Sequence, residues 1–262
     1  MSVIIRNQAI IHYEALGRGR PVVFLHSWIG SWRYWIPSMQ AASVSHRGYA
    51  LDLFGYGDTT HDPSLYALGP QADLLTGFLD EMGIGKVAVV GHGLGAWVGC
   101  LAAARQPGRV ARIMAVSMPL EASSVHVRLR SDNPAELVDW LAGRRPESLD
   151  VLTDASRMDP GVVAGCIISF QAEDPFSQFL GTRVPCLLVY GLDDPSLQVP
   201  STDGSAPLGP NVHQVNLADS GHFPMMDAAD RFNRLLTDFL AVEPGLSLRD
   251  LQLKELWRRR IR

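Results

Sequence analysis

Short apolar runs alternate with amphipathic segments along most of the chain. Val3–Arg6 and Ala9–Tyr13 flank Asn7-Gln8 and predict an N-terminal β-hairpin. Later runs, rich in Val, Ile and Leu, are typical of strands buried on both faces of a parallel sheet. They lie at Val22–Leu25, Tyr49–Leu53, Val87–Val90, Ile113–Val116, Cys186–Tyr190 and Val212–Leu217, and helical spacing of apolar residues marks Pro70–Met82, Ala96–Arg105 and Ala228–Ala241. Strands that alternate with helices after an antiparallel start predict an α/β sheet with an antiparallel N-terminal edge.

One connection is far longer than the others. About 65 residues separate the run that ends at Val116 from the run that begins near Val184, which is too long for an ordinary loop. Within it, Pro134–Ala142, Glu147–Arg157 and Gly161–Gln171 have helical patterns. We expect a small helical cap over the carboxyl ends of the strands, where open α/β sheets bind ligands. The predicted division is therefore core 1–119, cap 120–183, core 184–243 and an amphipathic tail 244–262.

Composition narrows the class of protein. The 262 residues are 47% hydrophobic, and 23 basic against 27 acidic side chains give a formal charge of −4, which excludes a chain-wide basic field for nucleic acid. Three widely spaced cysteines form neither a disulfide scaffold nor a metal-ligand spacing. The N-terminus lacks signal-peptide order, and no apolar stretch reaches the roughly 18 residues of a membrane span. We expect a soluble cytoplasmic protein with no nucleic-acid partner and no stable membrane insertion.

The tail has a separate pattern. Residues 246–262 carry six basic side chains, and Leu253, Leu256, Trp257 and Ile261 would share one face of a helix. Such a helix would pack on its own domain or on a second copy of the chain. We expect a monomer or a homodimer.

The motif most indicative of chemistry follows Val87–Val90, the third of the runs predicted to form parallel strands. Val87–Val90 leads into Gly91-His92-Gly93-Leu94-Gly95 and then into a helix of small residues, which is the strand–turn–helix context of a nucleophile elbow. Four other motifs accompany it in order: His26-Ser27-Trp28, Asp52-Leu53-Phe54-Gly55-Tyr56-Gly57-Asp58, Gly191-Leu192-Asp193-Asp194 and Ser220-Gly221-His222-Phe223-Pro224. On these five motifs the chain resembles the α/β-hydrolase superfamily over nearly its whole length.

The resemblance implies a catalytic triad with one member missing. It implies a nucleophile at position 93, an acid at Asp194 and a base at His222, with Asp193 as the competing acid. The backbone N–H groups of Trp28 and Leu94 are the expected oxyanion hole. Position 93 is glycine, which has no nucleophilic atom, so the usual acyl-enzyme route cannot begin there. Epoxide and haloalkane hydrolysis, which need an aspartate at the elbow, are disfavoured equally. Cys100 lies two helical turns farther on and does not obviously substitute.

Residues near the elbow and the base predict the lining of a ligand site. Side chains expected to contact a small, largely apolar ligand are Ser27, Trp32, Trp35, Phe223 and Met225. Neither a metal nor a cofactor is implied. The glycines of the elbow imitate a dinucleotide fingerprint, but Val98 stands where its last glycine belongs.

Three hypotheses remain open at this point. The protein could bind an ester- or carbonyl-containing molecule without turning it over. It could be a serine-independent enzyme in which His222 and Asp194 activate a water or abstract a proton, because the missing side chain leaves space in front of the base. The glycine could also be a deliberate serine-to-glycine substitution that inactivates a hydrolase in order to trap its substrate.

Overall fold

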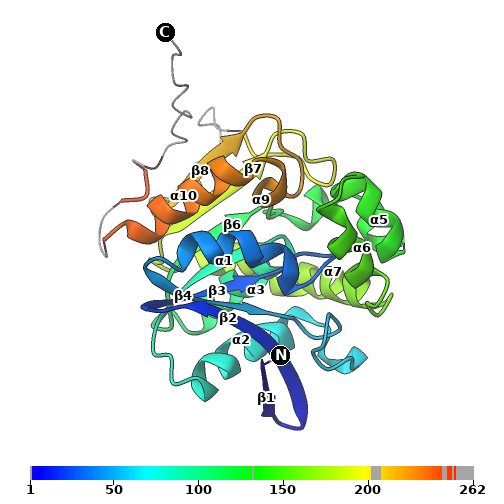
Figure 1. Ribbon diagram of the computed structural model, residues 1–262, viewed down its shortest axis with the longest axis horizontal. Coiled ribbons are helices and arrows are strands. Elements are labelled where there is room, and N and C mark those ends of the chain that lie inside the picture. Colours follow the sequence, from blue (N-terminus) through cyan, green and yellow to red (C-terminus); the bar gives the residue numbers. More distant parts are fainter. Residues whose placement is uncertain (1, 132, 202–207, 244–246, 250, 252–262) are drawn as a thin grey trace.

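The computed structural model describes residues 2–131, 133–201, 208–243, 247–249 and 251, and within them eight strands form one sheet (Figure 1). The strand order is β1-β2-β4-β3-β5-β6-β7-β8. Strands β1 and β2 form the hairpin, β2 pairs antiparallel with β4, and the remaining pairs are parallel. The bounds are β1 Ser2–Arg6, β2 Ala9–Gly17, β3 Arg20–Leu25, β4 His46–Leu51, β5 Val87–His92, β6 Val110–Val116, β7 Cys186–Gly191 and β8 Val212–Leu217. This arrangement confirms the predicted α/β sheet with an antiparallel edge.

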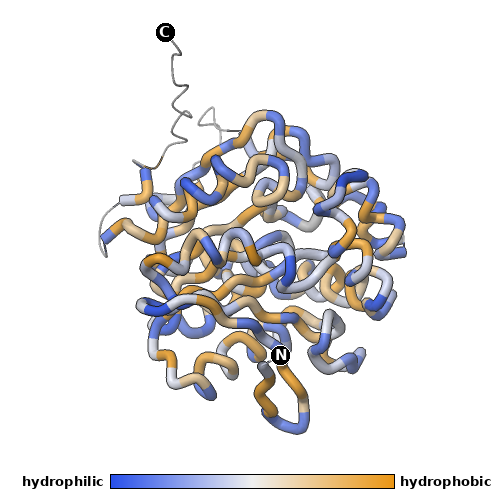
Figure 2. The backbone as a smooth tube through the Cα atoms, in the orientation of Figure 1, coloured by the Kyte–Doolittle hydropathy of each residue, from blue (hydrophilic) through white to orange (hydrophobic). Residues whose placement is uncertain are grey.

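Helices cover both faces of the sheet, as the handedness of its crossovers requires. Along the sheet, the connection from β3 to β4 runs toward β1, and the connection from β4 to β5 runs toward β8. Because both crossovers are right-handed, the helices in these two connections lie on opposite faces of the sheet. Accordingly α1 (Ile36–Ala42) packs on α10 (Ala229–Ala241), and α2 (Leu68–Glu81) packs on α3 (Leu94–Arg105). Every residue of β7 is buried, which explains its unbroken apolar sequence. Figure 2 shows apolar positions concentrated in the central strands.

The predicted helices are present with small shifts at their ends. The helices that were not predicted from the apolar pattern include α1 and α8 (Pro175–Leu180). Both are short, and each has a proline in its first turn, Pro37 in α1 and Pro175 in α8. Proline is tolerated there because the first N–H groups of a helix have no partner within it. The predicted strand Tyr49–Leu53 ends earlier, at Leu51, and residues 52 and 53 belong to the following loop.

The long connection between β6 and β7 contains helices that gather at one end of the sheet (Figure 1). Helix α6 docks on the loop after β3, where Asp154 accepts hydrogen bonds from Ser31 Oγ (2.5 Å) and Arg33 Nε (3.2 Å). Helix α7 packs on α2, and α8 packs on α3. A separate cap over 120–183 stays a prediction. The elements are η3 Ala122–Ser124, α4 Arg128–Ser131, α5 Pro134–Leu141, α6 Ser148–Ala155, α7 Val162–Glu173 and α8.

Only a small part of the predicted tail is described. Leu248 is buried, and the carbonyl of Leu251 accepts a hydrogen bond from His213 Nε2 (2.9 Å), so this part of the chain returns to the core. The predicted face of Leu253, Leu256, Trp257 and Ile261 lies outside the described residues. No helix in the described part of the chain is long and apolar enough to cross a membrane.

Candidate active site

The turn between β5 and α3 is built from close backbone approaches. Gly93 has φ +46° and ψ −107°, a conformation that side-chain-bearing residues rarely adopt, and its N–H donates to Val116 O (2.8 Å). A Cβ on Gly95 would lie 2.4 Å from Leu25 O, and the N–H of Gly95 donates to His26 O (3.0 Å). The small residues of this motif therefore let the strand, the helix and the loop after β3 meet at one point.

The loops after β7 and β8 bring a histidine and a carboxylate together. His222 precedes α9 (Pro224–Asp227), and its Nδ1 lies 2.8 Å from Asp194 Oδ2. Asp194 is buried and Asp193 is exposed, so Asp194 is the carboxylate that contacts the ring. Ser196 supports the pair, because its hydroxyl donates to Asp194 Oδ1 (2.6 Å) and lies 3.0 Å from His222 Nδ1. Ser196 did not stand out in the sequence because its role depends on the turn that Asp194 makes.

The surroundings of Asp194 keep it ionised. Burial raises the pKa of this carboxyl, but the charge of His222 and hydrogen bonds from His222 and Ser196 lower it by more, so its pKa lies below the ordinary value. An ionised Asp194 accepts the Nδ1–H of His222 and leaves Nε2 as the unprotonated nitrogen. The basic nitrogen is therefore the one that faces the elbow.

Ser27 occupies the place in front of that nitrogen. Its Oγ lies 3.1 Å from His222 Nε2, and both side chains are fully buried. A Cβ built on Gly93 would lie 2.1 Å from the same Oγ. The space expected to hold a water or a substrate oxygen is thus filled by the Ser27 hydroxyl, which corrects that expectation. The sequence places Ser27 and His222 195 residues apart and shows no sign of their contact.

A buried relay fixes the backbone on both sides of this contact. The N–H of Ser27 donates to Tyr34 Oη (2.8 Å), whose hydroxyl faces His92 Nδ1 (3.0 Å). The other ring nitrogen of His92 donates to His222 O (2.7 Å). Burial, with a smaller contribution from the charge of His222, holds the pKa of His92 well below its usual value, so the ring is neutral. The loop of Ser27 and the loop of His222 are therefore joined through neutral hydrogen bonds.

Trp28 has a buried side-chain donor beside the elbow. Its indole Nε1 is buried and has no hydrogen-bond partner among the described residues, and it lies 2.9 Å from the Cβ position at Gly93. Buried N–H groups are nearly always satisfied, so an unpaired donor at this place calls for an explanation. Leu94 is the first residue of α3 and is also buried. The oxyanion hole expected from the backbone N–H groups of Trp28 and Leu94 stays a prediction.

The remaining expected ligand contacts lie in clusters of rings and apolar side chains. Trp35 packs between Phe24 and Phe232, with ring centroids 5.4 and 6.3 Å away. Trp32 is partly buried with its ring 6.0 Å from that of His12. Phe223 packs edge-on against Tyr34 and His92, and Met225 is buried beside it. A role of these four residues in ligand binding stays a prediction.

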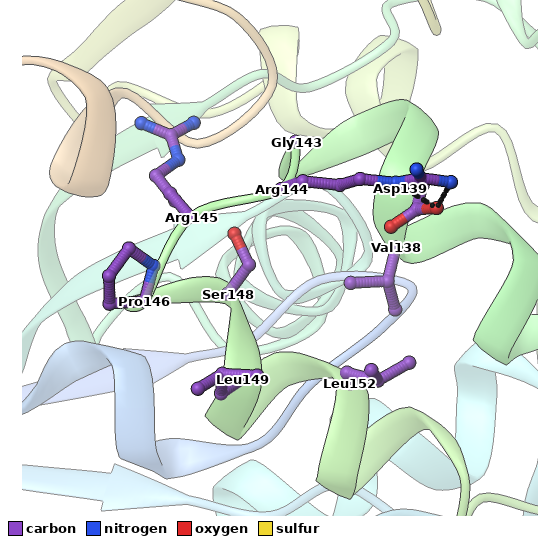
Figure 3. A pocket seen from close by; sticks show the side chains of 9 residues that line it. All are labelled: Val138, Asp139, Gly143, Arg144, Arg145, Pro146, Ser148, Leu149 and Leu152. Carbon is purple, nitrogen blue, oxygen red and sulfur yellow. Dashed lines mark hydrogen bonds and ion pairs between the residues drawn. The ribbon is translucent and has the colours of Figure 1, made fainter.

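Metal ligands, a second nucleophile and a pocket are the other features of the described residues that bear on chemistry. Within the described residues no group of three or more His, Cys, Asp or Glu side chains is placed to hold a metal ion. Cys100 is buried, and burial raises the pKa of its thiol well above the ordinary value, so it is no ready nucleophile. A surface hollow of about 450 Å³ lies between α5 and α6, and its lining includes the apolar side chains of Val138, Leu149 and Leu152 (Figure 3). None of its lining residues belongs to the Ser27–His222–Asp194 cluster.

Comparison with known proteins places this geometry in context. The acetyltransferase component of an acetoin-cleaving system from Cupriavidus necator is 27% identical over 88% of this chain and 66% of its own length. Epoxide hydrolase 1 from Siraitia grosvenorii is 31% identical over 70% of this chain and 56% of its own length. The chain thus spans only about half to two thirds of these curated relatives.

A solved structure shares the fold. It is an N-acyl homoserine lactonase with a serine-to-glycine substitution, complexed with N-hexanoyl homoserine lactone; it superposes with a TM-score of 0.81 at 21% identity and covers 91% of this chain and 96% of its own. The sequence profile of the alpha/beta hydrolase family matches residues 22–235. The match covers most of the chain and includes the elbow, Asp194 and His222. The chain belongs to the alpha/beta hydrolase family.

Proposed function

We propose that this protein hydrolyses a small, largely apolar molecule that contains an ester or a similar carbonyl group, with His222 as the general base. One observation carries the proposal: His222 Nδ1 is held by Asp194 at 2.8 Å, while Nε2 faces the hydroxyl of Ser27, 3.1 Å away. An imidazole whose Nδ1 is bound by a carboxylate presents Nε2 as a base for proton transfer. A protein that only binds a ligand has no evident use for such an arrangement.

The surroundings of the elbow support an apolar substrate. The ring of Trp28 packs edge-on against Trp97 with centroids 4.7 Å apart, and Trp97 stacks on Phe170 of α7 at 3.6 Å. These buried rings make the surroundings of the elbow apolar, which favours an acyl chain over a charged group as a ligand. The lactonase complex and the hydrolase relative are consistent with small substrates. Epoxide opening is disfavoured, because position 93 has no carboxylate.

Binding without turnover is the second candidate function, and Gly93 is the observation that favours it. The two functions differ in what happens to a bound ester. In a pure binder the ester stays intact, and the His222 side chain affects affinity only. In the proposed hydrolase the ester is cleaved, and the rate depends on the unprotonated Nε2 of His222.

The deciding experiment is release of p-nitrophenol from its acetate and butyrate esters. We expect the wild type to cleave both and His222→Gln to lose about 10²-fold or more in kcat/KM, because the base is gone. His61→Gln is the matched control, since His61 is exposed and its Nε2 donates a hydrogen bond to the Gly57 carbonyl, away from the His222–Asp194 pair. No release above buffer by the wild type, or equal rates for the wild type and His222→Gln, would overturn the proposal.

A further inference from the structure

We propose that Ser27 is the nucleophile of this site, supplied by the loop after β3 instead of by the elbow. The inference rests on the proposed hydrolytic function and adds a residue with a covalent role. Ser27 Oγ, His222 and Asp194 form an uninterrupted series of contacts of 3.1 and 2.8 Å. A hydroxyl, an imidazole and a buried carboxylate in this order form the arrangement that activates a serine, whatever the positions of the residues in the chain.

Gly93 makes this position available. The Oγ of Ser27 lies 2.1 Å from where a Cβ of residue 93 would be, so a side chain at the elbow and the hydroxyl of Ser27 would compete for one volume. With glycine at position 93, the hydroxyl enters that volume from the neighbouring loop and lies 3.1 Å from His222 Nε2. The absence of a side chain at position 93 therefore allows the contact between Ser27 and His222.

Two backbone hydrogen bonds fix the position of Ser27. Its N–H donates to Tyr34 Oη (2.8 Å), and its carbonyl accepts from His26 Nδ1 (2.9 Å). His26 in turn accepts the N–H of Leu53 at Nε2 (3.0 Å), which fixes its tautomer. Because both backbone groups of Ser27 are anchored in a fully buried loop, the hydroxyl is positioned before a substrate arrives.

The adjacent residue supplies a donor for the developing negative charge. The indole N–H of Trp28 has no partner among the described residues and lies 2.9 Å from the Cβ position at Gly93, next to the Ser27 hydroxyl. A fixed donor of this kind in a dry site stabilises an oxyanion more than it would in water. We assign it the oxygen of the substrate carbonyl.

The reaction that follows is balanced. Ser27 Oγ attacks the ester carbonyl carbon as His222 Nε2 takes the hydroxyl proton, and the carbonyl oxygen becomes an oxyanion near the Trp28 indole. Collapse of this intermediate breaks the bond to the leaving alcohol oxygen, which receives the proton from Nε2 and leaves an acyl ester on Ser27. A water then gives a proton to Nε2 and attacks the acyl carbon. Ser27 recovers that proton as the carboxylic acid departs.

A purely structural Ser27 would also fill the volume beside Gly93 and hydrogen-bond His222. The two roles differ in covalent reactivity, because only an activated serine attacks a phosphorus electrophile. Diisopropyl fluorophosphate is a small probe of that reactivity. A diisopropylphosphoryl adduct, formed at the serine oxygen as fluoride leaves, is therefore a readout that a structural serine would not produce.

The experiment is labelling of the intact wild-type chain with this probe, followed by mass spectrometry. We expect one adduct per chain within the tryptic peptide 19–33, with fragment ions that place it on Ser27 and not on Ser31. Ser27→Ala should lose the adduct. His222→Gln should react at least about 10²-fold more slowly than the wild type. Ser38→Ala is the matched control, a buried serine in α1 whose hydroxyl donates to Asn233, and it should label like the wild type.

Failure of this inference is distinct from failure of the hydrolytic proposal. Hydrolysis of p-nitrophenyl esters that depends on His222, together with an adduct on another residue or none, would overturn Ser27 as the nucleophile and leave the proposed function standing. Absence of both hydrolysis and adduct would overturn both. The adduct is mapped on the wild-type chain. The inference can therefore be overturned even if the Ser27→Ala chain fails to fold.

Discussion

The hydroxyl of Ser27 and the absent side chain of Gly93 share one volume, because Ser27 Oγ lies 2.1 Å from the Cβ position of residue 93. Residues that share a volume are energetically coupled. We predict that Gly93→Ala costs more unfolding free energy in the wild type than in a Ser27→Gly background, by roughly 0.5–3 kcal/mol. The strain of a Cβ at φ +46° is present in both backgrounds and cancels. Urea unfolding of the four chains measures this difference, and additive effects would show that the two positions do not compete.

Trp28→Phe tests the orphan indole. The substitution keeps an aromatic ring against Trp97 and removes a donor that has no partner among the described residues. If the indole N–H holds the oxyanion, kcat on p-nitrophenyl butyrate should fall by about 10²-fold with little change in KM, because the interaction forms only in the transition state. Initial rates over a range of ester concentrations separate the two constants. A change in KM alone would assign Trp28 to substrate packing.

His12 makes the stability of the N-terminal edge depend on pH. Burial lowers the pKa of His12, but its hydrogen bond to Asp52 (2.8 Å) and the charges of Asp52, Asp58 and Glu14 raise it by more, so its pKa lies above the ordinary 6.5. The pKa of Asp52 is lowered despite its burial, by His12, His26 and the N–H of Trp32. The charged pair therefore stabilises the fold fully below pH 6.5, down to the acidic range where Asp52 protonates, and this contribution is lost as pH rises through the raised pKa of His12.

The corresponding variant is His12→Gln. We expect the wild type to exceed it in unfolding free energy by more at about pH 5.5 than at about pH 8.5, as measured by urea unfolding at both values. A difference that stays constant or grows with pH would contradict the assigned direction.

Asp154 holds α6 against the loop that carries Ser27. The carboxylate accepts hydrogen bonds from Ser31 and Arg33, and its removal leaves the buried Ser31 hydroxyl without this partner. We predict that Asp154→Ala speeds amide hydrogen exchange in residues 148–155 by about tenfold. Asp139→Ala is the control, because its pair with Arg144 is exposed and worth little. Equal exchange in the wild type and Asp154→Ala would show that other contacts hold α6.

Much of the fold follows from local sequence patterns. The apolar runs of β3, β5 and β7 are distinctive because strands buried on both faces admit few polar residues, and the motifs that follow them fall at the carboxyl ends of the strands, as expected of this family. Short helices such as α8 were missed, since six residues show little periodicity. Helix α8 packs against α3, and a local pattern does not contain such a long-range contact.

The site was less predictable than the fold. The pairing of His222 with Asp194 was expected from the family resemblance. The contact of Ser27 with His222 depends on a volume that Gly93 leaves empty and on a loop held by Tyr34 and His26. A sequence shows that a glycine has no side chain. It does not show which neighbour fills the space, because that depends on packing between residues far apart in the chain.

The most direct test of the account is kcat/KM for p-nitrophenyl butyrate in Ser27→Ala, measured beside the wild type and the Ser38→Ala control. With Ser27 as nucleophile and His222 as its base, Ser27→Ala should lose about 10³-fold or more, while Ser38→Ala keeps the wild-type value. A Ser27→Ala chain that hydrolyses the ester within about twofold of the wild-type rate would contradict it.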